Sequence, residues 1–357
     1  MTAKRNITLR DIAERAGVHL STVSLALKNS PNLPLATRTR LQALSKKLGY
    51  RPNPLVSALM AQRGRRRDAR VRSAIAYLLV YPKEFAWREN PLHRSIYEGA
   101  KERAEEFGFN VSTFDLSDGQ LTVDRLETIL AARGITGLML PPFVRETDIL
   151  RHLHWQNFCA ISIGTIYPHA TIDYVSNDNY QTMRLIHSRC RELGYERLGF
   201  VMNSSLNPVQ EFRFAAADLL EQSSLPAKRR IKPLFTEMRP GVDIWPRQIH
   251  EWCAKERPDV IVTPVSQHAE PWLSLIRELP GRPALVSLSV PPQNGPLAGI
   301  LQDGFEMGAV GAQMVISKVY RNETGPQPKR WAHLLAGAWL DGPSCPPRDG
   351  RLNRTHR

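Results

Sequence analysis

Over most of this 357-residue chain, short apolar runs alternate with amphipathic helical stretches. The runs typical of strands are 74–80, 110–114, 137–140, 160–163, 198–202, 260–263 and 284–288, and the predicted helices are 92–107, 123–133, 179–193, 209–221, 245–256 and 305–321. Strands separated by helices of this length form βαβ units and parallel sheets. Because residues 73–344 are too many for one compact sheet, we expect two α/β lobes, with ligands bound in the cleft between them.

The positive charge is concentrated at the start of the chain. Residues 1–72 contain 16 Lys and Arg but only three acidic residues, and therefore carry +13 of the total net charge of +14. Such an asymmetry indicates a polyanion-binding module attached to a nearly neutral body. The alternative is a solvated basic arm.

The pattern within the basic segment favours the binding module. A capping sequence at Thr8 opens a short helix over 9–15, Gly17 breaks it, and a second helix covers about 20–28. A third helix over 35–48 ends before Gly49, so the three form a helix-turn-helix whose second helix enters the major groove. Residues 53–61 form a fourth helix too short to be stable alone, and 63–72 form an exposed basic linker.

Three segments resemble the LacI/GalR family of bacterial transcriptional regulators. They are ITLRDIAERAGV at 7–18, STVS at 21–24 and GYRPN at 49–53, within a nearly gapless match over 7–62. The resemblance implies a homodimer that binds near-palindromic double-stranded operator DNA, with a hinge helix that folds only on DNA. It also implies a body of the type I periplasmic-binding-protein fold, with looser similarity at 175–178, 192–195 and 300–303.

The resemblance assigns DNA-binding positions residue by residue. Leu20 and Ser21 occupy the base-reading positions, Asn53 starts the hinge helix, and Leu59 takes the position of a minor-groove wedge. Positions that contact the DNA backbone, or share the exposed face of the second helix, are Thr8, His19, Thr22, Ser24, Lys28 and Asn32. Leu25 replaces an arginine that is common in the family, and it either contacts a thymine methyl group or packs against the third helix.

Candidate effector-binding residues lie in the body. Arg213 falls at the position of the family's effector-binding arginine, where a guanidinium would bind hydroxyls or a carboxylate. Gln302 and Asp303 follow an apolar run, and Trp87 and Trp245 are candidates to stack on a sugar; a surface role for Arg213 and core roles for the tryptophans are the alternatives. The chain lacks the acidic residues that many family members carry after strands 260–263 and 284–288, which puts binding of a simple hexose in doubt.

We therefore predict a small all-α helix-turn-helix head joined to a two-lobed α/β body of parallel sheets flanked by helices. The predicted divisions are the head 1–50, hinge helix 51–62, linker 63–72, body 73–344 and tail 345–357, with lobes 73–172 plus 301–329 and 173–300 plus 330–344. The predicted function is a repressor whose operator affinity is modulated by a small molecule, a sugar or sugar derivative, bound between the lobes. The alternatives are a ligand-independent DNA-binding regulator and one that responds to a non-sugar effector such as a purine.

Other functional classes find little support in the sequence. Dinucleotide, P-loop, nucleophile-elbow and zinc-protease motifs are absent, so we expect neither enzymatic activity nor a cofactor or metal. The four scattered cysteines are typical of reduced thiols, and no apolar run approaches the roughly 20 residues that span a bilayer. The start of the chain lacks a signal-peptide pattern, so we expect a cytoplasmic protein without membrane contact that joins the nucleoid when bound to DNA. Residues 343–357 lack heptad leucines, which predicts a dimer and not a tetramer.

Overall fold

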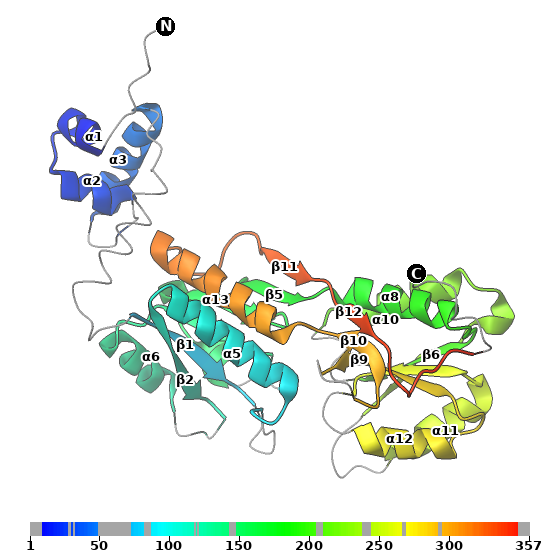
Figure 1. The fold of residues 1–357 in the computed structure, drawn as a ribbon. Helices are drawn as coiled ribbons and strands as arrows, with labels where there is room; N and C mark the ends of the chain where they lie inside the picture. The colour runs from blue at the N-terminus through cyan, green and yellow to red at the C-terminus, as the bar shows by residue number, and fades with distance from the viewer. Residues whose placement is uncertain are drawn as a thin grey trace, which may run out of the picture.

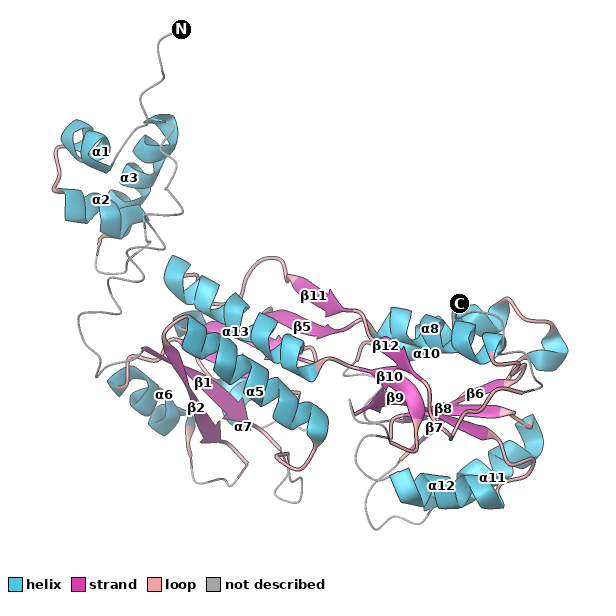
Figure 2. Ribbon diagram, viewed as in Figure 1, coloured by secondary structure: helices cyan, strands magenta, loops and turns pink. Residues whose placement is uncertain are grey.

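The computed structural model describes residues 9–27, 30, 33–48, 73–81, 87–117, 119, 121–142, 148–204, 210–237, 244–265, 269–291 and 295–348 (Figures 1 and 2). They form a three-helix head and a body with two six-stranded sheets. This confirms the predicted fold class.

The head is built from α1 (Leu9–Ala16), α2 (Leu20–Leu27) and α3 (Leu35–Leu48). Gly17 separates α1 from α2 with a φ of 63°, a left-handed conformation that glycine adopts without steric cost. Ile12, Val23 and Leu41, one from each helix, are fully buried. These three side chains make the centre of a small core that holds the helices together.

The first sheet of the body has the strand order β11-β5-β4-β3-β1-β2, with every neighbouring pair parallel. Its strands are β1 (Ser73–Leu79), β2 (Phe109–Asp115), β3 (Gly137–Leu140), β4 (Cys159–Ile163), β5 (Asp173–Asn177) and β11 (Ala332–Leu335). Side chains alternate between its two faces. Ile75 and Tyr77 face α5 (Pro91–Glu106) and α13 (Gly304–Arg321), whereas Ala76 and Leu78 face α6 (Val123–Ala132) and α7 (Asp148–His152).

The second sheet has the order β12-β10-β9-β8-β6-β7 and is parallel except for β12, which pairs antiparallel with β10. Its strands are β6 (Leu198–Asn203), β7 (Leu234–Thr236), β8 (Val260–Thr263), β9 (Ala284–Val290), β10 (Ala298–Leu301) and β12 (Ala338–Leu340). One face packs against α8 (Asn179–Glu192) and α10 (Arg213–Ser223), and the other against α11 (Ile244–Glu256) and α12 (Ala269–Glu278).

The described chain passes between the two lobes after β5, after β10 and after β11 (Figure 1). The predicted lobe boundaries are therefore wrong in two places. We assigned 173–300 and 330–344 to the second lobe, but β5 and β11 pair with each other in the first sheet. The sequence pattern failed here because β5 carries polar residues and β11 is mostly exposed, so pairing with neighbouring strands, β4 and β11 for β5 and β5 for β11, defines them as strands.

The predicted helix over 209–221 begins only at Arg213. Glu211 and Phe212 have φ angles of 52° and 55°, and this left-handed backbone cannot continue a right-handed helix. The sequence analysis also missed strands β5, β7, β10, β11 and β12 and helices α7 and α12. Several of these are only three to five residues long, which gives a periodic pattern too few positions to show itself.

Candidate functional site

The head presents an exposed face on α2. Val23 and Ala26 are fully buried against α1 and α3, whereas Leu20 and Leu25 keep 42% and 37% of their surface exposed. Ser21 is exposed on the same helix, and Thr22 and Ser24 are half-buried. Leu25 therefore lies with Leu20 on the accessible side and is not part of the buried core of the head.

His19 fixes the amino end of α2. Its Nδ1 accepts a hydrogen bond from the backbone N–H of Ser21 at 3.3 Å and lies 2.8 Å from Ser21 Oγ. Because the first N–H groups of a helix have no partner within it, this contact caps the helix. The other end is braced by Gln42, whose Nε2 donates to the Ala26 carbonyl at 2.9 Å. The face of α2 is therefore held in place by contacts at both ends.

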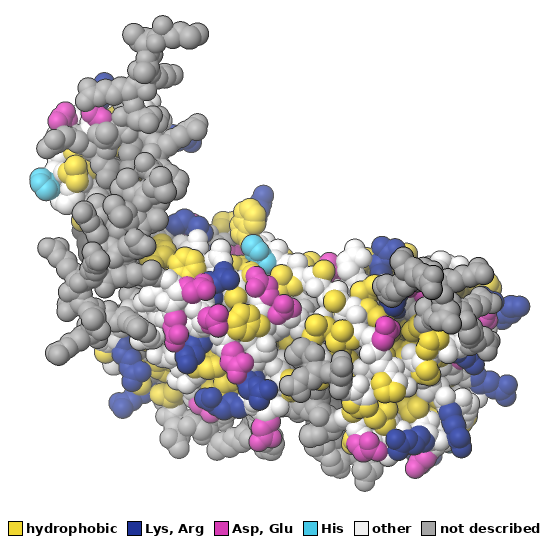
Figure 3. All heavy atoms as spheres, viewed as in Figure 1, with side chains coloured by type: hydrophobic (Ala, Val, Ile, Leu, Met, Phe, Trp, Pro, Cys, Tyr) yellow, Lys and Arg dark blue, Asp and Glu magenta, His cyan; other side chains and the backbone are white. Residues whose placement is uncertain are grey.

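The remaining predicted DNA-binding residues, Thr8, Lys28, Asn32, Asn53 and Leu59, lie outside the described residues, as do the hinge helix and the basic linker. On the face drawn in Figure 3, acidic and basic side chains are mixed over α5, and no continuous basic surface is seen on the described part of the body.

Gln302 and Asp303 lie at the chain crossing that follows β10. Gln302 Oε1 accepts from Asn177 Nδ2 at 2.8 Å, and Gln302 Nε2 donates to the Leu288 carbonyl at 2.9 Å. This amide therefore links β5 of the first lobe to β9 of the second. Asp303 is exposed and caps α13 by accepting from the Glu306 N–H at 2.9 Å.

Arg213 reaches from the first residue of α10 to the other lobe. Its Nη2 donates to the Tyr174 hydroxyl on β5 at 2.6 Å and to Glu211 Oε2 at 2.7 Å. Partial burial by itself would lower the pKa of Arg213, but the hydrogen bonds that Arg213 donates to Glu211 and Tyr174 outweigh it and raise that pKa. The guanidinium is thus charged and preorganised between the lobes. Sequence reasoning named Arg213 as a candidate but did not point to Tyr174 or Glu211, for which the local pattern carries no signal.

Trp87 belongs to an aromatic cluster, which we define as Tyr77, Tyr81, Trp87 and Tyr97. The Trp87 ring lies 6.2 Å from Tyr81 and 5.4 Å from Tyr97, and the Arg88 guanidinium stacks 4.5 Å above it. Tyr77 is completely buried, and among the described residues its hydroxyl has no hydrogen-bond partner. The cluster lies on the face of the first sheet covered by α5 and α13, with Tyr77 in β1 and Tyr97 on α5.

The structure does not bring all the predicted effector residues together. Among the described residues, no hydrogen bond or ring contact joins the aromatic cluster to Arg213. Trp245 lies in the first turn of α11, but its side chain is outside the description. The two sets that the structure assembles are Arg213 with Tyr174 and Glu211, and Gln302 with Asn177.

In the described part of the chain, no three His, Cys, Asp or Glu side chains converge on a possible metal position. The histidines that are close in the sequence have other partners: His152 hydrogen-bonds to the Asp148 carbonyl at 2.9 Å, and His154 contacts Glu127 at 3.1 Å. Within the same residues, no helix is both long and apolar enough to span a bilayer.

A head with an exposed second helix, followed by two α/β lobes that the chain crosses repeatedly, defines a helix-turn-helix protein with a periplasmic-binding-protein-like body. Residues 8–53 match the model described as bacterial regulatory proteins, lacI family. The match covers the three-helix head of the chain.

Similarity to known proteins extends beyond the head. The maltose regulon regulatory protein MalI of Escherichia coli K12 is 25% identical over 225 residues, which are 62% of this chain and 61% of MalI. A solved CelR–cellobiose complex superposes with a TM-score of 0.58 at 19% identity, over 95% of this chain and all of that one. A lac repressor dimer bound to operator gives 0.54 at 16% identity, over 96% and 99%.

The sequence relatives are matched over part of their length, and the solved structures are matched at low identity. The chain spans 61% of MalI and 57% of the CelR regulator of Thermobifida fusca, which is less than two thirds of either relative. At 19% and 16% identity, the two solved structures show the fold alone.

Proposed function

We propose that this protein is a sequence-specific DNA-binding transcriptional repressor, and that a small molecule bound between its lobes modulates its affinity for operator DNA. The observation that carries the proposal is the exposed, capped face of α2 in a lacI-family head, attached to a body with a charged arginine between two lobes. Such a protein would be located in the cytoplasm and would associate with the nucleoid when bound to DNA.

In this proposal Leu20, Ser21 and Leu25 face the base edges. The hydroxyls of Thr22 and Ser24 contact phosphates together with His19, Thr8, Lys28 and Asn32. Asn53 starts a hinge helix that places Leu59 in the minor groove. Because two leucines on the reading face offer no hydrogen bonds to bases, sequence-dependent bending at the operator centre supplies much of the specificity.

A near-palindromic operator requires two heads, and we propose a homodimer. Large apolar side chains are exposed on both lobes: Leu219 on α10 is 70% exposed, and Trp331 beside β11 is 71% exposed. Leu220, Tyr320 and Leu334 add to these surfaces, with exposures of 49%, 49% and 42%. A second copy packed along both lobes would remove this apolar area from water.

The proposed effector is a sugar or sugar derivative bound near Arg213. This rests on the preorganised guanidinium and on the cellobiose in the structural relative. Glu211 already neutralises Arg213, which favours a neutral hydroxyl-rich ligand over an anion, because an anion would have to displace that carboxylate.

The DNA-binding part is tested with DNA that the full chain selects from a random pool. We expect log affinity to fall linearly as log salt rises, because Lys and Arg contacts release counterions from the phosphates. A fragment without residues 1–62 should keep its fold and its dimer but lose this binding. Retention of binding by the fragment would contradict the assignment.

The effector part is tested by thermal-shift screening of the full chain against sugars and nucleobases. A sugar that raises the Tm should bind Arg213→Ala about ten-fold or more weakly, since a charged hydrogen-bond donor is lost. Arg247→Ala is the matched control, because Arg247 is exposed on α11 and, within the described part of the chain, pairs only with Glu251 at 2.8 Å. Stabilisation by a nucleobase would favour the purine alternative, and no stabilisation by any compound would favour ligand-independent binding.

A further inference from the structure

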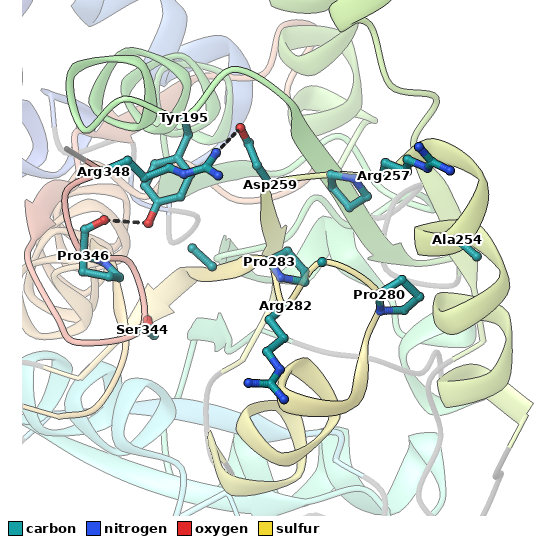
Figure 4. Close-up of a pocket in the computed structure, with 13 residues that line it drawn as sticks. Tyr195, Ala254, Arg257, Asp259, Pro280, Arg282, Pro283, Ser344, Pro346 and Arg348 are labelled. Atoms are coloured by element: carbon teal, nitrogen blue, oxygen red, sulfur yellow. Dashed lines mark hydrogen bonds and ion pairs between the residues drawn. The ribbon is translucent and has the colours of Figure 1, made fainter.

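The second lobe contains a pocket of about 910 Å³ (Figure 4). Its lining comes mainly from the loop between α11 and β8, the loop between α12 and β9, and the segment that follows β12. Both loops lead into the amino ends of parallel strands, whereas Gln302 and the chain crossing after β10 lie at the carboxyl ends. The pocket is therefore at the opposite end of the second sheet from the crossing that Gln302 occupies.

Hydrogen bonds fix the wall of the pocket beside its carboxylate. Asp259 accepts from two successive backbone N–H groups before β6, at 2.9 Å each, and its Oδ2 lies 2.7 Å from Arg348 Nη1. The Tyr195 hydroxyl donates to the Pro346 carbonyl at 2.6 Å, and the Arg348 guanidinium lies 5.5 Å from the centre of the Tyr195 ring. Figure 4 shows these contacts between the labelled residues. The Asp259 carboxylate is thus already paired with a guanidinium, and contacts within the lobe hold this wall in place.

An Arg-Pro pair stands just before each of the neighbouring strands β8 and β9, at 257–258 and at 282–283. The two strands pair in parallel, with Val260 opposite Ala284, so both arginines lie at the same edge of the sheet. The φ angles of the two arginines are 51° and 45°, a left-handed conformation that glycine adopts far more readily than a residue with a side chain. Residues held in such a conformation cluster at ligand-binding sites, and both of these line the pocket.

The pocket contains more positive than negative charge. Arg257 and Arg282 are both exposed, and within the described part of the chain neither guanidinium group makes a hydrogen bond or an ion pair. Because Asp259 already pairs with Arg348, the first two arginines leave the pocket with a net charge of +2. Guanidinium groups bind the oxygens of phosphates and carboxylates in pairs of hydrogen bonds, so two of them on neighbouring loops can hold one anion.

Proline rings give the pocket an apolar surface beside this charge. The prolines that line it are Pro258, Pro280, Pro283 and Pro346. In the view of Figure 4, Pro280 and Pro283 lie between Arg257 and Arg282. A ligand that fits the pocket therefore combines a compact anionic group with an apolar portion.

We propose that this pocket binds a phosphate monoester with an apolar carbon portion. Arg257 and Arg282 donate hydrogen bonds to the phosphate oxygens, and the proline rings contact the carbon portion. A phosphate monoester carries a charge of about −2 near neutral pH, which matches the net charge of the pocket, whereas a carboxylate supplies only one negative charge. The inference does not rest on the proposed function, because none of the lining residues is a proposed DNA-binding or effector-binding residue.

The first test locates the binding of phenyl phosphate on the full chain by hydrogen–deuterium exchange and requires no variant. Millimolar phenyl phosphate should slow exchange in the peptides that cover 254–260 and 279–286, because binding restrains the two loops. Slower exchange confined to residues 1–72 would show that the basic head binds the phosphate, and the proposal would be wrong. Unchanged exchange in both loops would contradict it equally.

Variants test the two arginines by isothermal titration calorimetry with phenyl phosphate. Arg257→Gln and Arg282→Gln should each weaken binding about ten-fold, because a charged hydrogen-bond donor is replaced by a neutral amide. Arg247→Gln and Arg277→Gln are the matched controls: they remove the same charge from exposed positions on α11 and α12, outside the pocket, and should bind as the wild type does. Equal weakening in all four variants would mean that only the general positive charge attracts the ligand, which would overturn the site.

Two further probes test the class of ligand. Benzoate keeps the ring but has a single negative charge, and should bind about ten-fold more weakly than phenyl phosphate. Inorganic phosphate keeps the charge but has no apolar portion, and should also bind more weakly, because it leaves the proline rings in contact with water. Benzoate that binds as tightly as phenyl phosphate would rule out selection of a phosphate, and inorganic phosphate that binds as tightly would rule out the role of the prolines.

Discussion

His93 lies near the amino end of α5, where its Nδ1 is 2.8 Å from the Tyr81 hydroxyl and its ring meets the Tyr81 ring edge-on at 5.1 Å. Burial lowers the pKa of His93 to about 4 from an ordinary value of 6.5. As the pH falls below 6.5, the unfolded chain therefore takes up a proton before the folded chain does. The stabilising contribution is complete above pH 6.5 and is lost between pH 6.5 and about pH 4.

We predict that the free energy of unfolding falls by about 2 kcal/mol between pH 7.5 and pH 5 because of this one group. Urea unfolding of the wild type and of His93→Phe at both pH values measures this fall. In the variant, the fall in the free energy of unfolding should be smaller by about 2 kcal/mol. His152→Phe, which changes a more exposed histidine on α7, should retain the full pH dependence. An unchanged pH dependence in His93→Phe would mean that the ring is protonated within the folded protein.

At the scale of elements, α5 and α13 pack with their backbones in contact. A Cβ atom built on Gly308 would lie 1.9 Å from the Ile96 carbonyl oxygen, and one on Gly99 would lie 1.9 Å from the Phe305 carbonyl oxygen. Neither backbone oxygen can move without shifting a whole helix. These glycines therefore bring α13, which follows the crossing from β10, close to the helix that carries His93.

Gly308→Ala should lower the free energy of unfolding by about 1–3 kcal/mol, because the added methyl group overpacks the helix contact. Gly311→Ala, one turn further along α13, is the control: its nearest neighbour would be the flexible Cδ1 of Ile163 at 2.9 Å. There the higher helix propensity of alanine, worth about 1 kcal/mol, should offset the crowding. Chemical denaturation compares the two variants, and equal stabilities would argue against a rigid α5–α13 contact.

For the whole molecule, we predict a dimer held together by both lobes. Sedimentation equilibrium should give twice the chain mass of 40.4 kDa and no tetramer. Placing glutamate at both Leu219 and Trp331 should shift the protein towards monomer and weaken operator binding in proportion, because two linked heads bind one operator far better than one head. Arg247→Glu, at an exposed position on α11, should leave the dimer intact. A stable tetramer, or a double variant that remains dimeric, would contradict this surface assignment.

The sequence by itself determined the elements whose signals are local. Unbroken apolar runs such as 137–140 and 260–263 became buried strands with the predicted bounds, and the apolar spacing around Gly17 was enough to predict the three-helix head. Arg213 became a candidate through the family resemblance, and its effector-binding role stays a prediction. For the strands and the head, the residues that set the structure lie within a few turns of one another, so their pattern is visible in the chain.

Only the tertiary structure decided which distant segments meet. β5 pairs with β4 in the first sheet, and β11, from near the end of the chain, pairs with β5; these two pairings moved the predicted lobe boundaries. Arg213 gained its partner Tyr174 across 39 positions, and the Tyr195 hydroxyl gained the Pro346 carbonyl only because residues near the end of the chain dock on the second lobe. Hydrogen bonds of this kind depend on proximity in space, and apolar periodicity along the sequence carries no record of it.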